Sequence, residues 1–289
     1  MNPVYQHVSD IAHDTIYHFI KSQEIQITQY TFNDYFQYIV DKHKIKTFPH
    51  HFENDLILGL TMIDQKGISI SYESENIPSR QNFTKCHEIG HLILQHDGTF
   101  FAEQAVSKNQ QELEADYFAS FVLMPDIILL TKILYQKLSY QKIQEQLKVS
   151  NKALEIRLTH FLQTYSSLPY PKVQGLVSSF RANTEAKENF IKQIHAFETQ
   201  IIEKYQSIQL TALEQVSRLI KKQAFISHLD CEAIKEKDIL SQIKVQYPNI
   251  GSGIYFDFGK AIHYIYQSDK ISAEEAKKMA KNLLFSLIL

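Results

Sequence analysis

NFTKCHEIGHLIL, residues 82–94, contains the pattern His-Glu-x-x-His and is predicted to lie on a helix that covers about residues 80–95. Because positions four apart share a face of a helix, His87 and His91 are expected to present imidazole nitrogens to a single zinc ion. Glu88 lies beside them, where its carboxylate can take a proton from a metal-bound water. The stretch therefore indicates a metal-dependent hydrolytic site carried on a helix.

A catalytic zinc needs a third protein ligand and an open fourth position, and the sequence offers two candidates. Asp97 lies six residues after His91, where one class of zinc proteases places its third ligand, but Leu94 occupies the position at which that class has a glycine. We favour Glu112, which lies on a second predicted helix over about residues 110–123. The alternative interpretation of Glu112 is an acidic, solvated helix face.

The second helix also offers an acid behind the metal. Asp116 shares a face with Glu112 and two alanines, which permit close approach of another helix. Asp116 is therefore predicted to accept a hydrogen bond from the free nitrogen of a ligating histidine. Glu114 lies about 200° around the helix from Glu112 and is expected to face elsewhere.

Together these segments resemble the ImmA/IrrE family of metallopeptidases. The resemblance is carried by residues 80–91, 112–119 and 123–125, and it covers about Phe32–Tyr165. It implies a cytoplasmic, gluzincin-like zinc protease with Glu88 as the catalytic base and three ligands to Zn2+, namely His87, His91 and Glu112. It further implies a protein substrate, a helix–turn–helix transcriptional repressor that controls a mobile element, a prophage or a stress response.

The sequence leaves one alternative function and the roles of three histidines undecided. The alternative is a non-proteolytic sensor or interaction protein that retains a metallopeptidase fold, although a retired site would be free to lose Glu88. His50, His51 and His96 lie near the active region in the sequence. Each is expected to be a surface or capping residue, and the sequence leaves open whether one of them assists the transition state.

Composition argues against several other classes of protein. The 289 residues are 44% hydrophobic and 21% charged, which is ordinary globular composition. The formal charge of −2 gives no basic field for nucleic acid. Two cysteines form no disulfide framework, and neither a signal peptide nor an apolar run of about 20 residues is evident. We therefore expect a cytoplasmic protein with no membrane association.

The order of predicted elements indicates an α+β fold for the metallopeptidase region. Leu56–Met62 and Ile68–Tyr72 are predicted strands around a glycine-containing turn, and amphipathic helical stretches precede and follow them. The expected architecture is a helical metallopeptidase domain with a small β-sheet. Pro169 and Pro171 disfavour helix continuation, so the domain is predicted to cover residues 1–165.

The remaining sequence is predicted to be mainly helical. Residues 166–289 are expected to form a regulatory or partner-binding domain, in which Thr184–Tyr205 is one long helix. Within the first domain, residues 138–162 have a helix–turn–helix outline. Its second helix offers only Lys152 and Arg157 against Glu155, a poor electrostatic footprint for DNA. We therefore favour packing or repressor docking over direct DNA binding.

Overall fold

Two β-sheets organise the chain, one of four strands and one of three. The computed structural model describes residues 3–52, 57–104 and 109–288. The chain divides into two compact units, the first formed by Met1–Ile20 with Ile25–Ile208 and the second by Lys21–Glu24 with Gln209–Leu289. The predicted α+β class is confirmed.

The first unit holds the four-stranded sheet and most of the helices. Its elements in chain order are α1 (Pro3–Ser22), η1 (Ile27–Gln29), α2 (Phe32–His43), β1 (Lys46–His50), β2 (Ile57–Asp64), β3 (Gly67–Glu73), α3 (Pro78–Ile93), β4 (Phe100–Gln104), α4 (Gln110–Leu123), α5 (Asp126–Leu130), a π-helical turn η2 (Thr131–Tyr135), α6 (Tyr140–Leu147), α7 (Asn151–Tyr165), α8 (Tyr170–Arg181), α9 (Lys187–Ala196) and α10 (Glu198–Ser207). α8–α10 thus extend this unit beyond residue 165.

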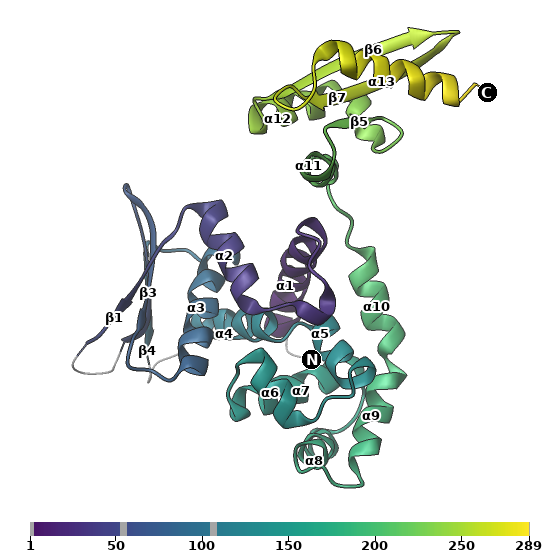
Figure 1. The fold of residues 1–289 in the computed structure, drawn as a ribbon. Coiled ribbons are helices and arrows are strands. Elements are labelled where there is room, and N and C mark those ends of the chain that lie inside the picture. Colours follow the sequence, from purple (N-terminus) through teal and green to yellow (C-terminus); the bar gives the residue numbers. More distant parts are fainter. Residues whose placement is uncertain (1–2, 53–56, 105–108, 289) are drawn as a thin grey trace. The chain divides into compact units, whose positions relative to one another are not determined.

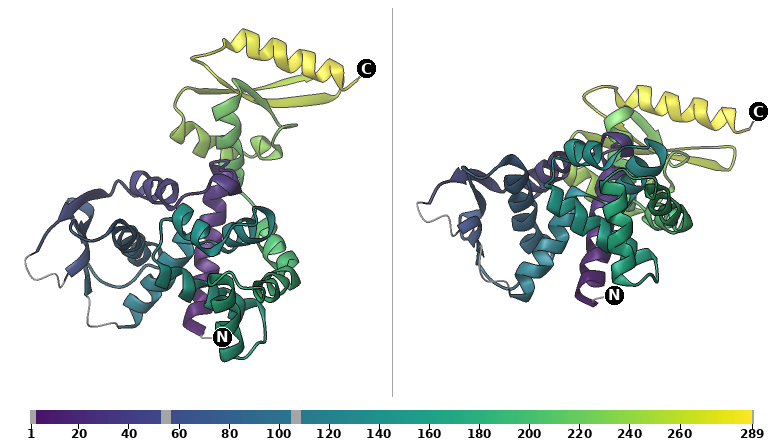
Figure 2. Two further views of the ribbon diagram at one scale, coloured as in Figure 1. Left: turned by 60° about the horizontal axis from the view of Figure 1, so that its bottom comes forward. Right: turned by 90° about the horizontal axis from the view of Figure 1, so that it is seen from below.

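The strand order of this sheet is β1-β3-β2-β4, with β1 parallel to β3 and the other pairs antiparallel. The two strands predicted from the sequence are β2 and β3, except that Leu56 lies outside the described residues. α3 packs against one face of the sheet, and the other helices of the unit lie on the same side (Figure 1, Figure 2). Since Thr61 of β2 contacts α3, this face of the sheet borders the His-Glu-x-x-His helix.

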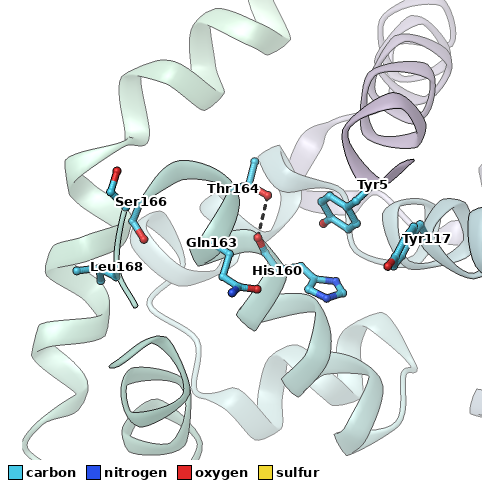
Figure 3. A pocket seen from close by; sticks show the side chains of 8 residues that line it. Tyr5, Tyr117, His160, Gln163, Thr164, Ser166 and Leu168 are labelled. Atoms are coloured by element: carbon cyan, nitrogen blue, oxygen red, sulfur yellow. Dashed lines mark hydrogen bonds between the residues drawn. The ribbon is translucent and has the colours of Figure 1, made fainter. Parts of the chain in front are cut away.

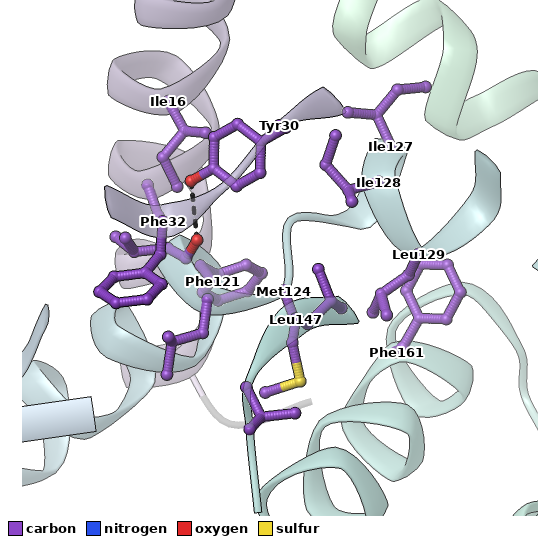
Figure 4. Packing of buried hydrophobic residues seen from close by; sticks show 14 of the residues in the cluster. Ile16, Tyr30, Phe32, Phe121, Met124, Ile127, Ile128, Leu129, Leu147 and Phe161 are labelled. Carbon is purple, nitrogen blue, oxygen red and sulfur yellow. Dashed lines mark hydrogen bonds between the residues drawn. The ribbon is translucent and has the colours of Figure 1, made fainter. Parts of the chain in front are cut away.

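A continuous apolar core joins the helices behind α3. Figure 4 shows side chains of α1, α4, α5 and α7 meeting in it, among them Ile16, Phe121, Leu129 and Phe161, all at most 1% exposed. The Tyr30 hydroxyl donates to the carbonyl of Val122 over 2.7 Å, which satisfies a polar group at the edge of the core. This core supports α4 from the side opposite the sheet.

A buried polar group lies within the same core and will be called the Asp126 cluster. The Asp126 carboxylate accepts hydrogen bonds from Arg157, from His13 at 2.9 Å and from the Tyr165 hydroxyl at 2.7 Å. Arg157 also donates to the carbonyl of Met124 at 3.2 Å. The Arg157 charge, the His13 charge and these hydrogen bonds outweigh burial and hold the pKa of Asp126 well below its usual range.

The predicted helix–turn–helix outline is present as α6 and α7. Ser150 caps α7 by accepting from the amide of Ala153 at 3.1 Å. Arg157, one of the two cations of the second helix, is 1% exposed and belongs to the Asp126 cluster. It is therefore unavailable to nucleic acid phosphates.

The first unit continues to Ile208, beyond the boundary predicted at residue 165. α8–α10 contribute buried side chains to the same core, including Val177, Phe190 and Ile201. The prolines at 169 and 171 open α8 instead of ending the domain, since proline is tolerated at the first turn of a helix. The single helix predicted over Thr184–Tyr205 is two helices, α9 and α10, which meet at Phe197.

The second unit combines helices with a sheet that the sequence did not predict. Its elements are α11 (Ala212–Lys222), β5 (Phe225–Ser227), η3 (Glu232–Lys235), α12 (Lys237–Gln246), β6 (Ile250–Asp257), β7 (Lys260–Gln267) and α13 (Ala273–Ser286), with antiparallel strand order β5-β7-β6. Alternation along β7 sends Ile262 and Tyr264 to a cluster with α13, and Ile265 to a cluster with α11 and α12. The sheet thus has an apolar layer on each face.

Within the described residues, no single helix is both long and apolar enough to cross a membrane. The helices Gln110–Leu123 and Asp126–Tyr135 reach that length and composition only as a pair, with a bend of 41° between them.

Candidate metal centre

Close packing of α3 on α4 sets the geometry of the site. A Cβ atom at Gly90 would lie 3.3 Å from the Cα of Ala115, so glycine and alanine at these positions let the two helices approach each other. Asn109 caps α4, accepting from the amide of Glu112 at 3.0 Å. The first turn of α4, and Glu112 with it, is thereby fixed beside the His-Glu-x-x-His segment.

The structure brings the three predicted metal ligands together; they will be called the metal cluster. The Nε2 atoms of His87 and His91 lie 3.2 Å apart. The Glu112 carboxylate lies 3.2 Å from His87 Nε2 and 3.5 Å from His91 Nε2. All three side chains are buried, and their potential ligand atoms fall within 4.8 Å of one another. The cluster has the composition and spacing to hold a metal ion.

The nitrogen of His87 that faces away from the metal cluster contacts Asp116. His87 Nδ1 lies 3.0 Å from the Asp116 carboxylate, to which it donates when Nε2 is free to bind a cation. A second possible grouping adds Glu103 to His87 and Asp116. Glu103 already accepts from Arg80 and, at 2.8 Å, from the Thr84 hydroxyl, so its charge is balanced by the chain itself.

The electrostatics of the metal cluster favour a cation. Burial opposes a charge on His87, but hydrogen bonds to Asp116 and Glu112 outweigh it and raise the pKa of His87 to about 10. Burial, reinforced by the neighbouring His87, lowers the pKa of His91 to about 3. One imidazole thus tends to hold positive charge while the other offers a lone pair toward the same point.

Glu88 is placed against the sheet, with one oxygen left free. Its Oε2 accepts from the Thr61 hydroxyl at 2.5 Å, whereas Oε1 is buried and has no hydrogen-bond partner among the described residues. Burial raises the pKa of Glu88 to about 8. A Cβ at Gly59 would lie 2.3 Å from Oε1, so only glycine leaves room for this carboxylate. The free oxygen is an acceptor without a donor.

The other candidates from the sequence have separate positions. His50 contacts Ser71 Oγ at 2.9 Å and His51 contacts Glu73 at 3.0 Å, both on the sheet. Neither histidine, nor Asp97, belongs to a potential metal-binding group within the described residues. His96, in contrast, contacts the metal cluster, because its Nδ1 lies 2.8 Å from Nδ1 of His91.

Glu114 has a role that helical geometry did not reveal. It faces away from the metal cluster, as expected, but its carboxylate lies 2.9 Å from Nε2 of His96. The sequence signal is the spacing of His91 and His96, five residues apart across the end of α3. That spacing becomes informative only once the chain is known to turn back at Gln95.

A separate cavity of about 380 Å3 lies between α1, α4 and α7, away from the metal cluster. Figure 3 shows the rings of Tyr5, Tyr117 and His160 along one part of its wall, with the neutral polar side chains of Gln163 and Thr164 nearby. None of the three metal-cluster residues lines it.

Residues 40–159 match the model of a peptidase family described as the IrrE N-terminal-like domain. This part of the chain is therefore an IrrE N-terminal-like domain, which confirms the resemblance to the ImmA/IrrE family of metallopeptidases. The match contains every residue of the metal cluster together with Glu88 and Asp116. No curated protein and no solved structure matches the chain significantly.

Proposed function

We propose that the chain is a zinc-dependent endopeptidase of the cell interior, with His87, His91 and Glu112 as ligands and Glu88 as the general base. The observation that carries the proposal is the convergence of three potential ligands from two helices within a peptidase-family domain. The three side chains come from positions 25 residues apart at the extremes, and helix packing alone unites them.

The spacing of the ligand atoms supports zinc. Zinc bonds of about 2.0–2.2 Å in a tetrahedral arrangement require neighbouring ligand atoms about 3.3–3.6 Å apart. The distances between the three side chains are 3.2, 3.2 and 3.5 Å. Two histidines with one carboxylate are also a ligand set of catalytic zinc sites, which leave the fourth position open.

The charge balance gives a second, independent support. Among the described residues, no lysine or arginine forms a hydrogen bond or ion pair with His87, His91 or Glu112. A buried carboxylate without a cationic partner is costly, and bound metal ions are one of the ways proteins meet that cost. Without a metal ion, the raised pKa of His87 lets this imidazole hold a proton as the counter-charge. A divalent cation would replace that proton and leave the Nε2 atom of His87 free as a ligand.

The chemistry then divides between the ion and Glu88. A bound zinc ion would polarise the substrate carbonyl and lower the pKa of a coordinated water. Glu88 accepts the proton of the attacking water through its unpartnered Oε1 and returns that proton to the nitrogen of the leaving amine. Thr61 holds the other carboxylate oxygen at 2.5 Å and so fixes the side chain while the proton moves.

The substrate we propose is a helix–turn–helix transcriptional repressor, on the strength of the ImmA/IrrE resemblance, and direct DNA binding is not part of the proposal. The burial of Arg157 within α7 supports this choice, because it removes a cation from the one candidate DNA-reading helix. We further propose that the part of the chain after the peptidase domain regulates the protease or selects its partner.

The test is cleavage by the full chain loaded with zinc, assayed on a panel of helix–turn–helix repressors and on a denatured protein as a general substrate. Glu88→Gln is expected to keep its zinc and lose about 10²–10⁴-fold in rate, since the amide cannot accept the proton. Glu145→Gln, an exposed change on α6, is the control. Wild-type turnover by Glu88→Gln would overturn the role of Glu88, and zinc-loaded wild type that cleaves nothing would favour the non-proteolytic alternative.

A further inference from the structure

A chain of three side chains runs away from the metal cluster behind His91. The Nδ1 atoms of His91 and His96 lie 2.8 Å apart. His96 Nε2 lies 2.9 Å from Oε2 of Glu114, and the amide of Gln110 donates to Oε1 of Glu114 at 2.8 Å. Each contact falls within ordinary hydrogen-bond distance, so the row connects His91 to a carboxylate on α4.

The backbone at the end of α3 makes this arrangement possible. α3 ends at Ile93, and Gln95 adopts the left-handed conformation with φ of 55°. The chain then turns back, and the amide of His96 donates to the carbonyl of His91 at 3.1 Å. The His96 side chain is only 4% exposed as a result, and it lies between the last turn of α3 and the first turns of α4.

The positions of the protons follow from what each atom can do. If His91 offers the lone pair of Nε2 to a metal, its proton must be on Nδ1. His91 Nδ1 then donates to His96 Nδ1, which must be the accepting nitrogen. His96 therefore carries its own proton on Nε2 and donates it to Glu114. Every hydrogen bond in the row points toward the carboxylate, and no donor faces another donor.

We propose that His96 and Glu114 are positioning residues that hold His91 in the tautomer and orientation required of a metal ligand. The inference rests on the proposed function, in which His91 binds zinc. Neither residue touches the metal or the substrate. Their role is to keep the proton on Nδ1 and the ring in place, so that Nε2 of His91 always faces the cluster.

The two histidine ligands would then be supported in different ways. His87 donates to a carboxylate directly, at 3.0 Å from Asp116. His91 reaches its carboxylate through an inserted imidazole. Because His96 is neutral when it relays the bond, it places no net charge next to His91, while Glu114 still orients the row.

Simple packing is the competing explanation, since Phe101 stacks on His91 with ring centroids 4.5 Å apart and planes 20° apart. An aromatic neighbour of this kind fixes a ring plane but does not select a tautomer. A structural role would therefore lower the stability of the metal-free protein and leave the zinc affinity of the folded protein unchanged. The hydrogen-bonded row predicts instead that zinc affinity falls while the stability of the metal-free protein changes little.

The experiment measures zinc affinity of the full chain by competition with a chelator of known affinity, alongside the thermal stability of the metal-free form. His96→Leu removes the acceptor for His91 and is expected to weaken zinc binding by about 10–100-fold. His96→Asn keeps an acceptor oxygen near the position of Nδ1 and is expected to restore most of that affinity. Glu114→Gln removes the charge but keeps an oxygen acceptor, so its loss is expected to be smaller than that of His96→Leu.

Exposed His43 on α2 supplies the control, since His43→Leu is expected to leave zinc affinity unchanged. The proposal is overturned if His96→Leu binds zinc as wild type does, or if His96→Asn is as weak as His96→Leu. His87→Ala, measured in parallel, separates the two levels of the argument. If His87→Ala leaves zinc affinity unchanged, the proposed zinc site itself is wrong. If His87→Ala loses zinc and the His96 variants bind it as wild type does, only the positioning role is wrong. Should His96→Leu not fold, Glu114→Leu takes its place, because it removes the acceptor that keeps the His96 proton on Nε2. Wild-type zinc affinity in Glu114→Leu would then overturn the proposal.

Discussion

The first unit buries two polar clusters that differ in how their charge is balanced. In the Asp126 cluster a single carboxylate is met by the Arg157 guanidinium, by His13 and by a tyrosine hydroxyl, all from the chain. In the metal cluster the Glu112 carboxylate meets two histidines, and Asp116 adds a further acid behind them. Within the described residues, no lysine or arginine bonds to the Glu112 carboxylate.

The difference indicates what each cluster is for. A buried ion pair that is complete within the chain needs no ligand, and its residues act on stability. A buried group with excess acceptors calls for a cation from outside the chain, and its residues act on binding and chemistry. Burial alone would not have separated the clusters, because Asp126 and Arg157 in one and His87, His91 and Glu112 in the other are all buried.

Breaking the Asp126 cluster should have the largest effect on stability. Arg157→Leu leaves the Asp126 carboxylate buried without its cation, so the free energy of unfolding is expected to fall by about 3–5 kcal/mol. Denaturant unfolding followed by circular dichroism measures it, with and without a metal chelator. The loss is expected to be the same in both conditions, because this cluster does not depend on metal.

The matched control is Arg181→Leu, which breaks an exposed ion pair with Glu155. Exposed pairs of this kind contribute about 0–1 kcal/mol, so little change is expected. Equal losses for the two arginine variants would contradict the distinction between a buried and a solvated pair.

Removing Asp116, which supports His87 of the metal cluster, should lower zinc affinity and leave the stability of the metal-free protein nearly unchanged. Asp116→Ala removes the acceptor for His87 and is expected to lower zinc affinity by about 10–100-fold. The metal-free protein should unfold at nearly the wild-type temperature, since the variant removes a partly buried acid and leaves no buried charge without a partner. Chelator competition and thermal unfolding of the same sample check both points. A large loss of metal-free stability with unchanged zinc affinity would show that Asp116 belongs with the structural residues.

The Asp126 cluster should also make the stability of the protein sensitive to acid. Arg157, His13 and their hydrogen bonds hold the pKa of Asp126 below its value of about 3.9 in an unfolded chain. The unfolded state therefore binds a proton first as the pH falls, and the stabilisation present above about pH 4 is lost below it. One proton limits the slope to about 1.4 kcal/mol per pH unit.

Thermal unfolding of the metal-free protein between about pH 6 and pH 2 tests this expectation. Asp126→Asn should flatten the acid slope, whereas the exposed change Asp41→Asn should leave it as in wild type. If both variants keep the wild-type slope, Asp126 does not contribute to acid sensitivity.

The smallest effect is expected at the boundary between the two units. A chain ending at Ile208 should keep its zinc and its thermal stability, because the core of the first unit is then complete. A chain ending at Ser167 loses α8–α10 and with them buried side chains such as Val177 and Phe190. Core residues that pack against these helices, such as Phe161 beside Phe197, are then exposed, so this chain should unfold or aggregate. Zinc content and circular dichroism of the two truncated chains measure the difference. A stable, zinc-binding chain ending at Ser167 would restore the boundary predicted at residue 165.

Much of the site could be predicted because its residues lie at fixed spacings on two helices. His87, Glu88 and His91 follow from one helical turn, and the face shared by Glu112 and Asp116 follows from the next helix. The connection from His91 to Glu114 could not be predicted, since it depends on the left-handed turn at Gln95.

The fold, too, could be predicted where a local sequence pattern marks an element, but not elsewhere. β2 and β3 alternate around a glycine turn, and Ser272 and Glu275 have the sequence spacing of the capping box that opens α13. The hairpin of β6 and β7 was missed because its turn uses Phe258 and Gly259, both at positive φ, without the asparagine or aspartate before glycine that usually indicates such a turn. The Pro169 boundary failed because the prolines begin a helix whose apolar face completes the core.

The central claim is that His87, His91 and Glu112 of the metal cluster together hold one zinc ion per chain. Metal analysis of the full chain, equilibrated with excess zinc and then freed of unbound metal, tests it most directly against the double variant His87→Ala/His91→Ala. The account predicts about one zinc per chain for wild type. It predicts almost none for the double variant, with the Asp126 cluster and the metal-free fold intact. One zinc per chain retained by the double variant would contradict it.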